Sequence, residues 1–230
     1  MDPYFSQSGV VIYHGDCADV LDGLRDAWGT RPFDLLLTDP PYGIGFAARP
    51  TKWQRRQGHV AEVWDDAPAS AILLADARAL ARWQIVWGGN YFDLPTSRCW
   101  LSWHKPDAPP SMGNVEYAWT NLDQNSRQIS YAISASNAER VGHPTQKPEA
   151  VMLWAIGQVA ADVGRVLDPF MGSGTTLVAA KRLGKQAVGV EQHERYCEIA
   201  ARRLAQEVLP DLSDDPPLDT QLFAQGALPF

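Results

Sequence analysis

Residues 39–43 place a carboxylate, two prolines and an aromatic ring directly after a run of leucines. The apolar residues 35–37 before them are typical of a fully buried strand in a parallel sheet. Because a proline ring fixes φ, the carbonyl of Pro40 and the carboxylate of Asp39 would be held rigidly at the end of that strand. Both oxygens can accept hydrogen bonds from an N–H group, but a simple rigid turn would need the same residues.

A second segment, residues 166–184, combines a strand, a glycine-containing turn and a helix. Gly172 and Gly174 allow the backbone to approach a ligand closely, and the helix that begins near Thr175 directs its N–H groups at that ligand. Glu191 follows Gly174 by 17 residues and ends the next predicted strand. An acid at that place can bind the hydroxyls of a ribose.

The chemistry of this second segment differs from that of a dinucleotide site. Leu177 replaces the third glycine of the dinucleotide fingerprint, and Asp168 at the strand end would repel a pyrophosphate. Asp168 would instead attract a cation. A ligand with a ribose, a positive centre and no phosphate fits these residues, which indicates S-adenosylmethionine. The alternative is an ordinary strand-to-helix turn that binds nothing.

These segments require an α/β framework to position them. Strand and helix patterns alternate along the chain, which predicts a mostly parallel sheet with helices on both faces. Strands are expected at residues 9–16, 33–38, 84–89, 99–105, 115–122, 127–134, 165–170 and 186–191. Helices are expected at residues 17–28, 69–81, 147–163, 174–184 and 193–208.

The charge of the chain is unevenly distributed. The net charge of the 230 residues is −7, but residues 207–230 carry five acids and no Lys or Arg. We therefore expect one domain at residues 1–206 and an acidic, flexible tail at 207–230. A basic cluster lies in a long loop, expected to be mobile, at about residues 47–66, and would bind phosphates or simply be solvated. It consists of Arg49, Lys52, Arg55 and Arg56.

Other features exclude several classes of protein. No apolar run approaches the ~20 residues that cross a bilayer, and the N-terminal residues lack the pattern of a signal peptide. Three scattered cysteines show no metal-ligand spacing, so no metal site is predicted. The expectation is a cytoplasmic protein that does not bind membranes.

Four segments in this order resemble the amino-group DNA methyltransferases of the permuted β group, over about residues 9–205. They read "HGDCADVL" (14–21), "DPPYG" (39–43), "HPTQKP" (143–148) and "DPFMGSGTT" (168–176). The resemblance implies a Rossmann-like class I methyltransferase fold with a small target-recognition region at about residues 105–142. It also implies a methyl transfer from S-adenosylmethionine to an exocyclic nitrogen of a base in duplex DNA, in a protein of bacterial or phage origin.

The resemblance assigns catalysis to Asp39, Pro40, Pro41 and Tyr42. A base inside a duplex cannot be reached, so it is flipped out. The lone pair of its exocyclic amine is delocalised into the ring, and two acceptors, Asp39 and the Pro40 carbonyl, would localise that lone pair for attack. Tyr42 would stack on the flipped ring, a contact worth ~1–3 kcal/mol.

The resemblance also implies a set of cofactor-binding residues. Asp16 would contact the adenine moiety of the cofactor, and Lys147 would pair with its carboxylate or remain a solvated lysine. The expected set is Asp16, Cys17, Lys147, Asp168, Phe170, Gly172, Ser173, Gly174, Thr175, Thr176 and Glu191.

Several questions stay open at this point. Family members that act on cytosine N4 usually carry Ser where this chain has Asp39, so adenine N6 is the expected target and cytosine N4 the alternative. A DNA-binding protein without turnover, and a methyltransferase for RNA or protein amides, are further hypotheses. The small recognition region raises the prospect of a homodimer. Residues 225–230, "QGALPF", resemble peptides that bind bacterial sliding clamps.

Overall fold

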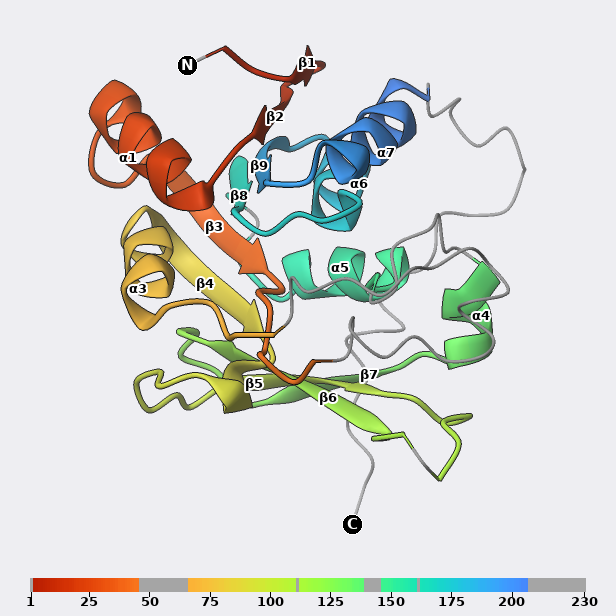
Figure 1. Cartoon of the computed structure of the whole chain (residues 1–230). Coiled ribbons are helices and arrows are strands. Elements are labelled where there is room, and N and C mark those ends of the chain that lie inside the picture. Colours follow the sequence, from red (N-terminus) through yellow and green to blue (C-terminus); the bar gives the residue numbers. More distant parts are fainter. Residues whose placement is uncertain (1, 46–65, 111, 139–145, 161, 207–230) are drawn as a thin grey trace.

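Strands and helices alternate along most of the chain, and the strands assemble into one mixed sheet. The computed structural model describes residues 2–45, 66–110, 112–138, 146–160 and 162–206. Within these residues nine strands pair in the order β1-β2-β9-β8-β3-β4-β6-β5-β7 (Figure 1). Their bounds are β1 Phe5–Gln7, β2 Val10–His14, β3 Phe33–Thr38, β4 Ala81–Trp87, β5 Trp100–His104, β6 Val115–Thr120, β7 Arg127–Ser130, β8 Arg165–Asp168 and β9 Gln186–Glu191.

The five central strands β2, β9, β8, β3 and β4 run parallel, as expected for strands linked by helices. Strand β6 then pairs antiparallel with both β4 and β5, and β7 lies parallel to β5 at the far edge. Strand β1, which the sequence patterns did not predict, adds an antiparallel edge beside β2. The sheet therefore has a parallel centre with antiparallel additions at both ends.

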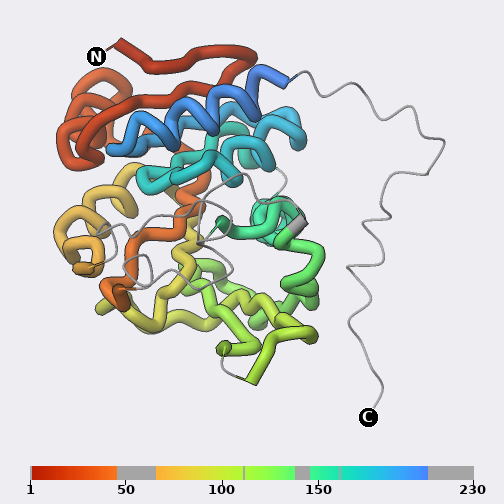
Figure 2. The backbone as a smooth tube through the Cα atoms, turned by 45° about the vertical axis from the view of Figure 1, so that its right-hand side comes forward, coloured from red at the N-terminus to blue at the C-terminus, as the bar shows by residue number. Residues whose placement is uncertain are grey.

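Helices cover both faces of the parallel centre. Helices α1 (Cys17–Trp28) and α3 (Ala71–Ala79) lie on one face, and α5 (Glu149–Ile156), α6 (Thr175–Arg182) and α7 (Glu194–Ala205) lie on the other (Figure 1). The tube in Figure 2 shows α6 and α7 stacked over the sheet near the N-terminal strands. A short α4 (Ile133–Ala138) and a 3₁₀ turn, η1 (Gly89–Tyr91), complete the described elements.

The apolar run of β3 explains why both faces are covered. Leu35 and Leu37 point into the core beneath α5, α6 and α7, whereas Leu36 points into the core beneath α1 and α3. All three side chains are fully buried. Where a strand alternates between two cores, consecutive residues must be apolar, and residues 35–37 of β3 show this pattern.

The order of strands creates a switch point at the centre of the sheet. The chain leaves β3 toward β4 on one side and leaves β8 toward β9 on the other, while β3 and β8 pair directly. Ligands of open α/β sheets bind outside the carboxyl ends of strands at such a point. Asp39 follows β3 and Asp168 ends β8, so both acids lie at the switch point.

Two local predictions were wrong. Residues 131–134 were expected to continue a strand, but α4 begins at Ile133 because Asp107, in a separate loop, accepts hydrogen bonds from the backbone N–H groups of Ile133 (2.6 Å) and Ser134 (2.9 Å). Helix α5 ends at Ile156 rather than at residue 163, since the chain after it forms tighter turns, such as the Gln158 N–H to Ala155 carbonyl bond of 3.1 Å.

No helix among the described residues is both long and apolar enough to span a bilayer. The loop at 47–65, residues 139–142 of the recognition region and the tail at 207–230 lie outside the described residues.

Replacement of Leu36 by Ala is expected to lower the free energy of unfolding by about 2–5 kcal/mol, because it leaves a cavity beneath α1 and α3. Urea denaturation measures the change. Ile72→Ala is the matched control, since Ile72 is 78% exposed on α3 and its truncation should change stability by less than about 0.5 kcal/mol. A similar loss for both variants would contradict the packing described here.

Candidate active site

Two acids mark the switch point at the carboxyl end of the sheet. The hydroxyl of Thr38, the last residue of β3, donates a 2.8 Å hydrogen bond to Oδ1 of Asp168, and the backbone N–H of Phe170 donates to the same oxygen at 3.1 Å. Asp168 is almost fully buried. Burial raises the pKa of its carboxyl to about 6, and these hydrogen bonds oppose the rise. The side chain can therefore change its charge close to neutral pH.

A first cavity of about 240 Å³ opens beside Asp168. Ten of the eleven residues predicted to bind a cofactor line it, from four separate parts of the chain. These ten are Asp16, Cys17, Lys147, Asp168, Phe170, Gly172, Ser173, Thr175, Thr176 and Glu191. The fold thus brings together residues that lie up to 175 positions apart in the sequence (191 minus 16).

The glycine turn and Glu191 hold each other in place at this cavity. One carboxylate oxygen of Glu191 accepts a hydrogen bond from the Gly172 N–H (3.2 Å), and the other accepts one from the His193 N–H (2.7 Å). Burial raises the pKa of Glu191, although these N–H groups act in the opposite direction. Next to Glu191, where the Gly15 N–H donates to the Glu191 carbonyl at 3.0 Å, Asp16 caps α1 by accepting from the Ala18 N–H at 2.8 Å.

Gly174 is the predicted cofactor residue that does not line the cavity. Its φ of +79° lies in the left-handed region, and a Cβ there would stand 2.7 Å from the Cβ of Ala200 on α7. The missing side chain lets the start of α6 pack directly against α7. Helix packing therefore explains why residue 174 is a glycine, and the sequence motif alone did not reveal this reason.

A second cavity of about 380 Å³ adjoins the first. The residues predicted to be catalytic, Asp39, Pro40, Pro41 and Tyr42, line it together with aromatic side chains of η1, β5 and β6. Four residues line both cavities and so form the wall between them: Asp39, Pro41, Gln146 and Lys147. A group in one cavity can therefore approach a group in the other across a wall that contains the Asp39 carboxylate.

The Asp39 carboxylate has partners on both oxygens. The Tyr42 hydroxyl donates a short hydrogen bond to Oδ1, and the Lys147 ammonium lies 2.6 Å from Oδ2. Burial raises the pKa of Asp39, and Lys147 and Tyr42 oppose that rise. Burial and the adjacent charge of Asp39 raise the pKa of Tyr42 well above its ordinary value, so its hydroxyl keeps the proton that it donates.

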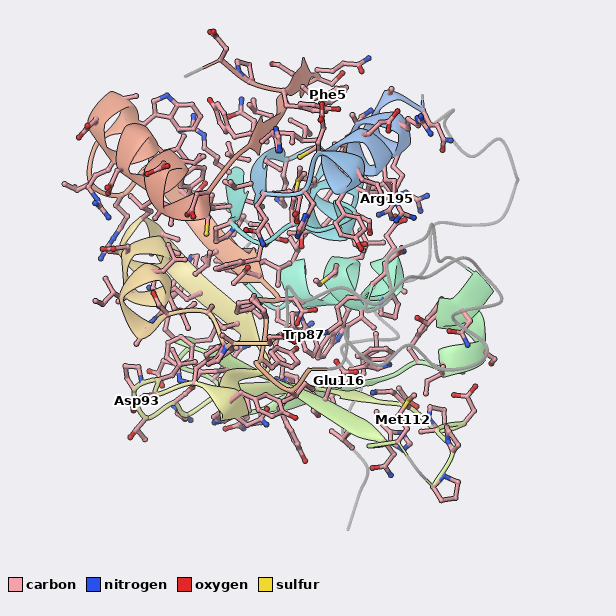
Figure 3. The ribbon with its side chains drawn as sticks, in the orientation of Figure 1. Phe5, Trp87, Asp93, Met112, Glu116 and Arg195 are labelled. Carbon is pink, nitrogen blue, oxygen red and sulfur yellow. The ribbon has the colours of Figure 1, made fainter. Side chains whose placement is uncertain are left out.

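A buried chain of charges continues from Asp39 along the floor of the second cavity. Lys147 also lies 3.1 Å from Glu116 on β6, and the other oxygen of Glu116 lies 2.6 Å from the ammonium of Lys105. Both Glu116 and Trp87, which are labelled in Figure 3, contact Lys147. The Lys147 ammonium lies 5.7 Å from the centre of the Trp87 ring.

The ring of Tyr42 is fixed from several sides. It stacks on Tyr91 with ring centres 4.8 Å apart and planes 12° from parallel, and it meets the edge of Phe92 at 6.2 Å. Gly88 makes room for it, since a Cβ at that position would lie 2.0 Å from Cε1 of Tyr42. The side chain is thus held where its hydroxyl reaches Asp39.

Comparison with known families matches residues 86–202 to the model of the N6/N4 methyltransferases, described as DNA methylases. The match covers 117 of the 230 residues, which is slightly more than half of the chain. The chain belongs to the amino-group DNA methyltransferases.

Known relatives and structures agree with this membership. The type II methyltransferase M.ScaI of Streptomyces caespitosus is 27% identical over 266 aligned positions, which cover 89% of this chain and 84% of that protein. A crystal structure of M1.HpyAVI with SAM covers 85% of this chain and 99% of its own, with 21% identity and a TM-score of 0.57. The PvuII DNA methyltransferase, described as cytosine-N4-specific, covers 90% of both chains, with 16% identity and a TM-score of 0.60. The two structures share the fold.

Several residues of this methyltransferase site were not foreseen from the sequence. Glu116 and Lys105 read as residues of half-exposed strands, yet they join the charge chain that ends at Asp39. Tyr91 lies in a turn that had no motif, and stacks on Tyr42. Gln146 lines both cavities. It directly precedes Lys147 in the "HPTQKP" segment, and this position was the only sign in the sequence that it belongs to the site.

The predicted DNA-binding residues Arg49, Lys52, Arg55 and Arg56 lie outside the described residues, as does His143 of the "HPTQKP" segment. Among the residues that the structure does describe, no group of three His, Cys, Asp or Glu side chains could hold a metal ion.

We expect Gly88→Ala to destabilise this methyltransferase by about 1–3 kcal/mol in urea denaturation, because the new methyl group would overlap the Tyr42 ring. Gly184→Ala is the control, since Gly184 has a φ of +67°, close to the +66° of Gly88, but no atom lies within 4 Å of the place that its methyl group would take. The difference between the two variants isolates the overlap from backbone strain. Equal losses would mean that Gly88 is needed only for its φ.

Proposed function

We propose that this protein transfers a methyl group from S-adenosylmethionine to N6 of an adenine that is flipped out of duplex DNA. The observation that carries the proposal is the position of Asp39 in the wall shared by two adjacent cavities. Family membership supports methylation of an exocyclic amino group in DNA.

The chemistry of the first cavity fits S-adenosylmethionine. Its lining includes four acids, Asp16, Asp39, Asp168 and Glu191. Among the described lining residues the only Lys or Arg is Lys147, whose ammonium contacts Asp39 and Glu116. Such a lining suits a cationic nucleoside and disfavours a phosphate. Bound there, the cofactor supplies an electrophilic methyl group on a positively charged sulfur.

In this proposal the nucleoside and the positive centre of the cofactor each have partners. Asp16 and Glu191 would accept hydrogen bonds from the nucleoside, beside backbone that the glycine turn leaves open at Gly172. Asp168 provides a negative charge near the positive centre. Phe170 contributes apolar surface to the same cavity.

On the other side of the wall, Asp39 and the Pro40 carbonyl would accept hydrogen bonds from the target amine. Each carboxylate oxygen of Asp39 already accepts one bond, and a carboxylate offers about four acceptor positions, so room remains for the amine. Two fixed acceptors draw the nitrogen toward tetrahedral geometry and localise its lone pair. Because this positioning is built in before substrate arrives, it lowers the entropic part of the barrier.

The aromatic lining of the second cavity supports a flipped base as its occupant. Tyr42, Tyr91, Trp103 and Tyr117 all line it. Tyr91 and Tyr117 are about half exposed, so their rings can stack on a base, a contact worth ~1–3 kcal/mol. Stacking accepts any base, whereas the Asp39 and Pro40 oxygens select one that carries an amino group. Cytosine N4 is the alternative target, since the matching family model covers both amines.

DNA methylation can be tested directly. Duplex DNA is incubated with the protein and S-adenosylmethionine carrying a tritiated methyl group, and the nucleosides are then separated. We expect the label in N6-methyl-2′-deoxyadenosine. Label in N4-methyl-2′-deoxycytidine alone would keep the site and overturn the choice of adenine. No transfer to DNA, with transfer to RNA or to protein amides, would overturn the substrate class.

In the same assay Asp39→Ala is expected to reduce the turnover number by about 10²-fold or more, a loss similar to removal of one preorganised hydrogen-bonding group at other active sites. Asp123→Ala is the control, because the Asp123 side chain is 88% exposed and pairs only with Arg98 among the described residues. Normal turnover of the Asp39 variant would overturn the proposed mechanism.

Cofactor affinity should depend on pH through Asp168. The carboxyl has a pKa of about 6 and is negative above that value, so the dissociation constant of S-adenosylmethionine should rise as pH falls from 7 to 5. S-adenosylhomocysteine lacks the positive charge on sulfur and should show a several-fold smaller change, as should the Asp168→Asn variant with either ligand. Calorimetry at several pH values measures this. Equal pH dependence for both ligands would contradict an electrostatic role for Asp168.

Four expectations stay predictions: the target-recognition region at about 105–142, the domain boundary at residue 206, a homodimer, and a clamp contact through residues 225–230. The basic residues of the 47–66 loop would contribute salt-dependent affinity for the DNA backbone in this proposal.

A further inference from the structure

The Lys147 ammonium contacts residues of the second cavity through all of its donors. It lies 2.6 Å from Oδ2 of Asp39, 3.2 Å from the Tyr42 hydroxyl and 3.1 Å from Oε2 of Glu116. An ammonium group has three N–H donors, so these three acceptors match its capacity. The Lys147 side chain is only 6% exposed. A carboxylate in the first cavity would have to compete with three partners already in place.

Glu116 fixes Lys147 from the side opposite Asp39. Its other oxygen lies 2.6 Å from the ammonium of Lys105, whose side chain is 7% exposed. Lys105 in turn lies over the ring of Trp103 at 5.0 Å. Two lysines and two acids thus alternate along the cavity floor, so that each buried charge has a neighbour of opposite sign.

We propose that Lys147, anchored by Glu116, is a positioning residue that keeps the Asp39 carboxylate ionised and directed at the target amine, and that it does not bind the carboxylate of the cofactor. This inference rests on the proposed role of Asp39 as an acceptor for the amine. It gives Lys147 a task in methyl transfer rather than in cofactor affinity.

The physical reason is the cost of burying Asp39. A protonated carboxyl group would turn one acceptor into a donor and lose its negative charge. Burial favours that protonated form and raises the pKa of Asp39, whereas the charge and hydrogen bond of Lys147 lower it. Burial would also lower the pKa of Lys147, but Asp39 and Glu116 outweigh it and raise that pKa well above its ordinary value. Lys147 therefore stays charged at neutral pH.

Glu116 acts on Asp39 in two ways. Its negative charge raises the pKa of Asp39 directly, while its contact with Lys147 holds the ammonium in place. The titratable groups that face Asp39 among the described residues are Lys147, Glu116, Tyr42 and, across the switch point, Asp168. Of these, Lys147 alone carries a positive charge, so its removal should have the largest effect on Asp39.

The decisive variant is Lys147→Met, whose unbranched side chain is one atom shorter and carries no charge. We expect the turnover number to fall about 10- to 100-fold, the acid limb of the pH–rate profile to move to higher pH, and the KM for S-adenosylmethionine to change less than about threefold. Lys147→Arg should restore part of the turnover and return the acid limb toward its original pH. Lys185→Met is the control, since the Lys185 ammonium donates to the Val163 carbonyl and lines neither cavity.

Glu116→Gln provides a test of opposite sign. Loss of the negative charge should move the acid limb to lower pH, because Glu116 raises the pKa of Asp39. A purely structural role for the charge chain would lower turnover in both variants without opposite shifts in the profile.

A rise of tenfold or more in the KM for S-adenosylmethionine in Lys147→Met, with turnover and acid limb unchanged, would overturn the inference and assign Lys147 to the cofactor. Carboxyl-carbon NMR of the full chain, with the Asp39 signal assigned from Asp39→Asn, separates this from failure of the proposed function. The Asp39 pKa should rise in Lys147→Met even if no DNA methylation is ever detected. An unchanged Asp39 pKa overturns the inference, whereas absence of methylation by the wild-type protein overturns only the proposed function.

Discussion

The direct pairing of β3 with β8 is the contact on which the rest of the site depends. It aligns Leu35 with Val166 and Leu36 with Leu167, so that the ends of the two strands lie side by side. Asp39 and Asp168 come from different halves of the chain, and only this pairing makes them neighbours. The Thr38 to Asp168 hydrogen bond then joins the two strand ends through side chains. Both cavities open at this junction. The glycine turn at Gly172 comes shortly after the end of β8 in the chain.

The second constraint is the desolvation of charge. The side chains of Lys105 and Lys147 are almost fully buried, and those of Asp39 and Glu116 are 20% and 30% exposed, so an unpaired charge among them would be costly. They are stable there because acids and lysines alternate at distances of 2.6–3.1 Å. Removal of one member leaves its neighbour unpaired, which generally costs more than the pair itself contributes. The chain of charges therefore adds little to the stability of the fold, but it fixes the positions of these four side chains.

Much of this arrangement could be predicted from the sequence. The apolar run of β3, the prolines after Asp39 and the turn at Gly172 are local signals, and each formed the predicted structure in the predicted order. Their meeting at one point followed from a general rule for parallel sheets. What remained hidden depended on contacts between distant segments. Asp107 caps α4 from another loop, and the inward direction of Glu116 depends on the pairing of β6 with β4 and β5. Neither leaves a trace in the local pattern.

The Thr38 to Asp168 contact joins residues 130 positions apart, and this bears on how the chain is made. On a ribosome the segment with Asp39 emerges long before β8, so the growing chain carries an apolar strand with one neighbour missing. Contacts of such long range close late and slow the folding of a domain. The central strand β3 therefore lacks one neighbour until β8, at residues 165–168, has been made, and the Asp39 carboxylate acquires its surroundings only after that.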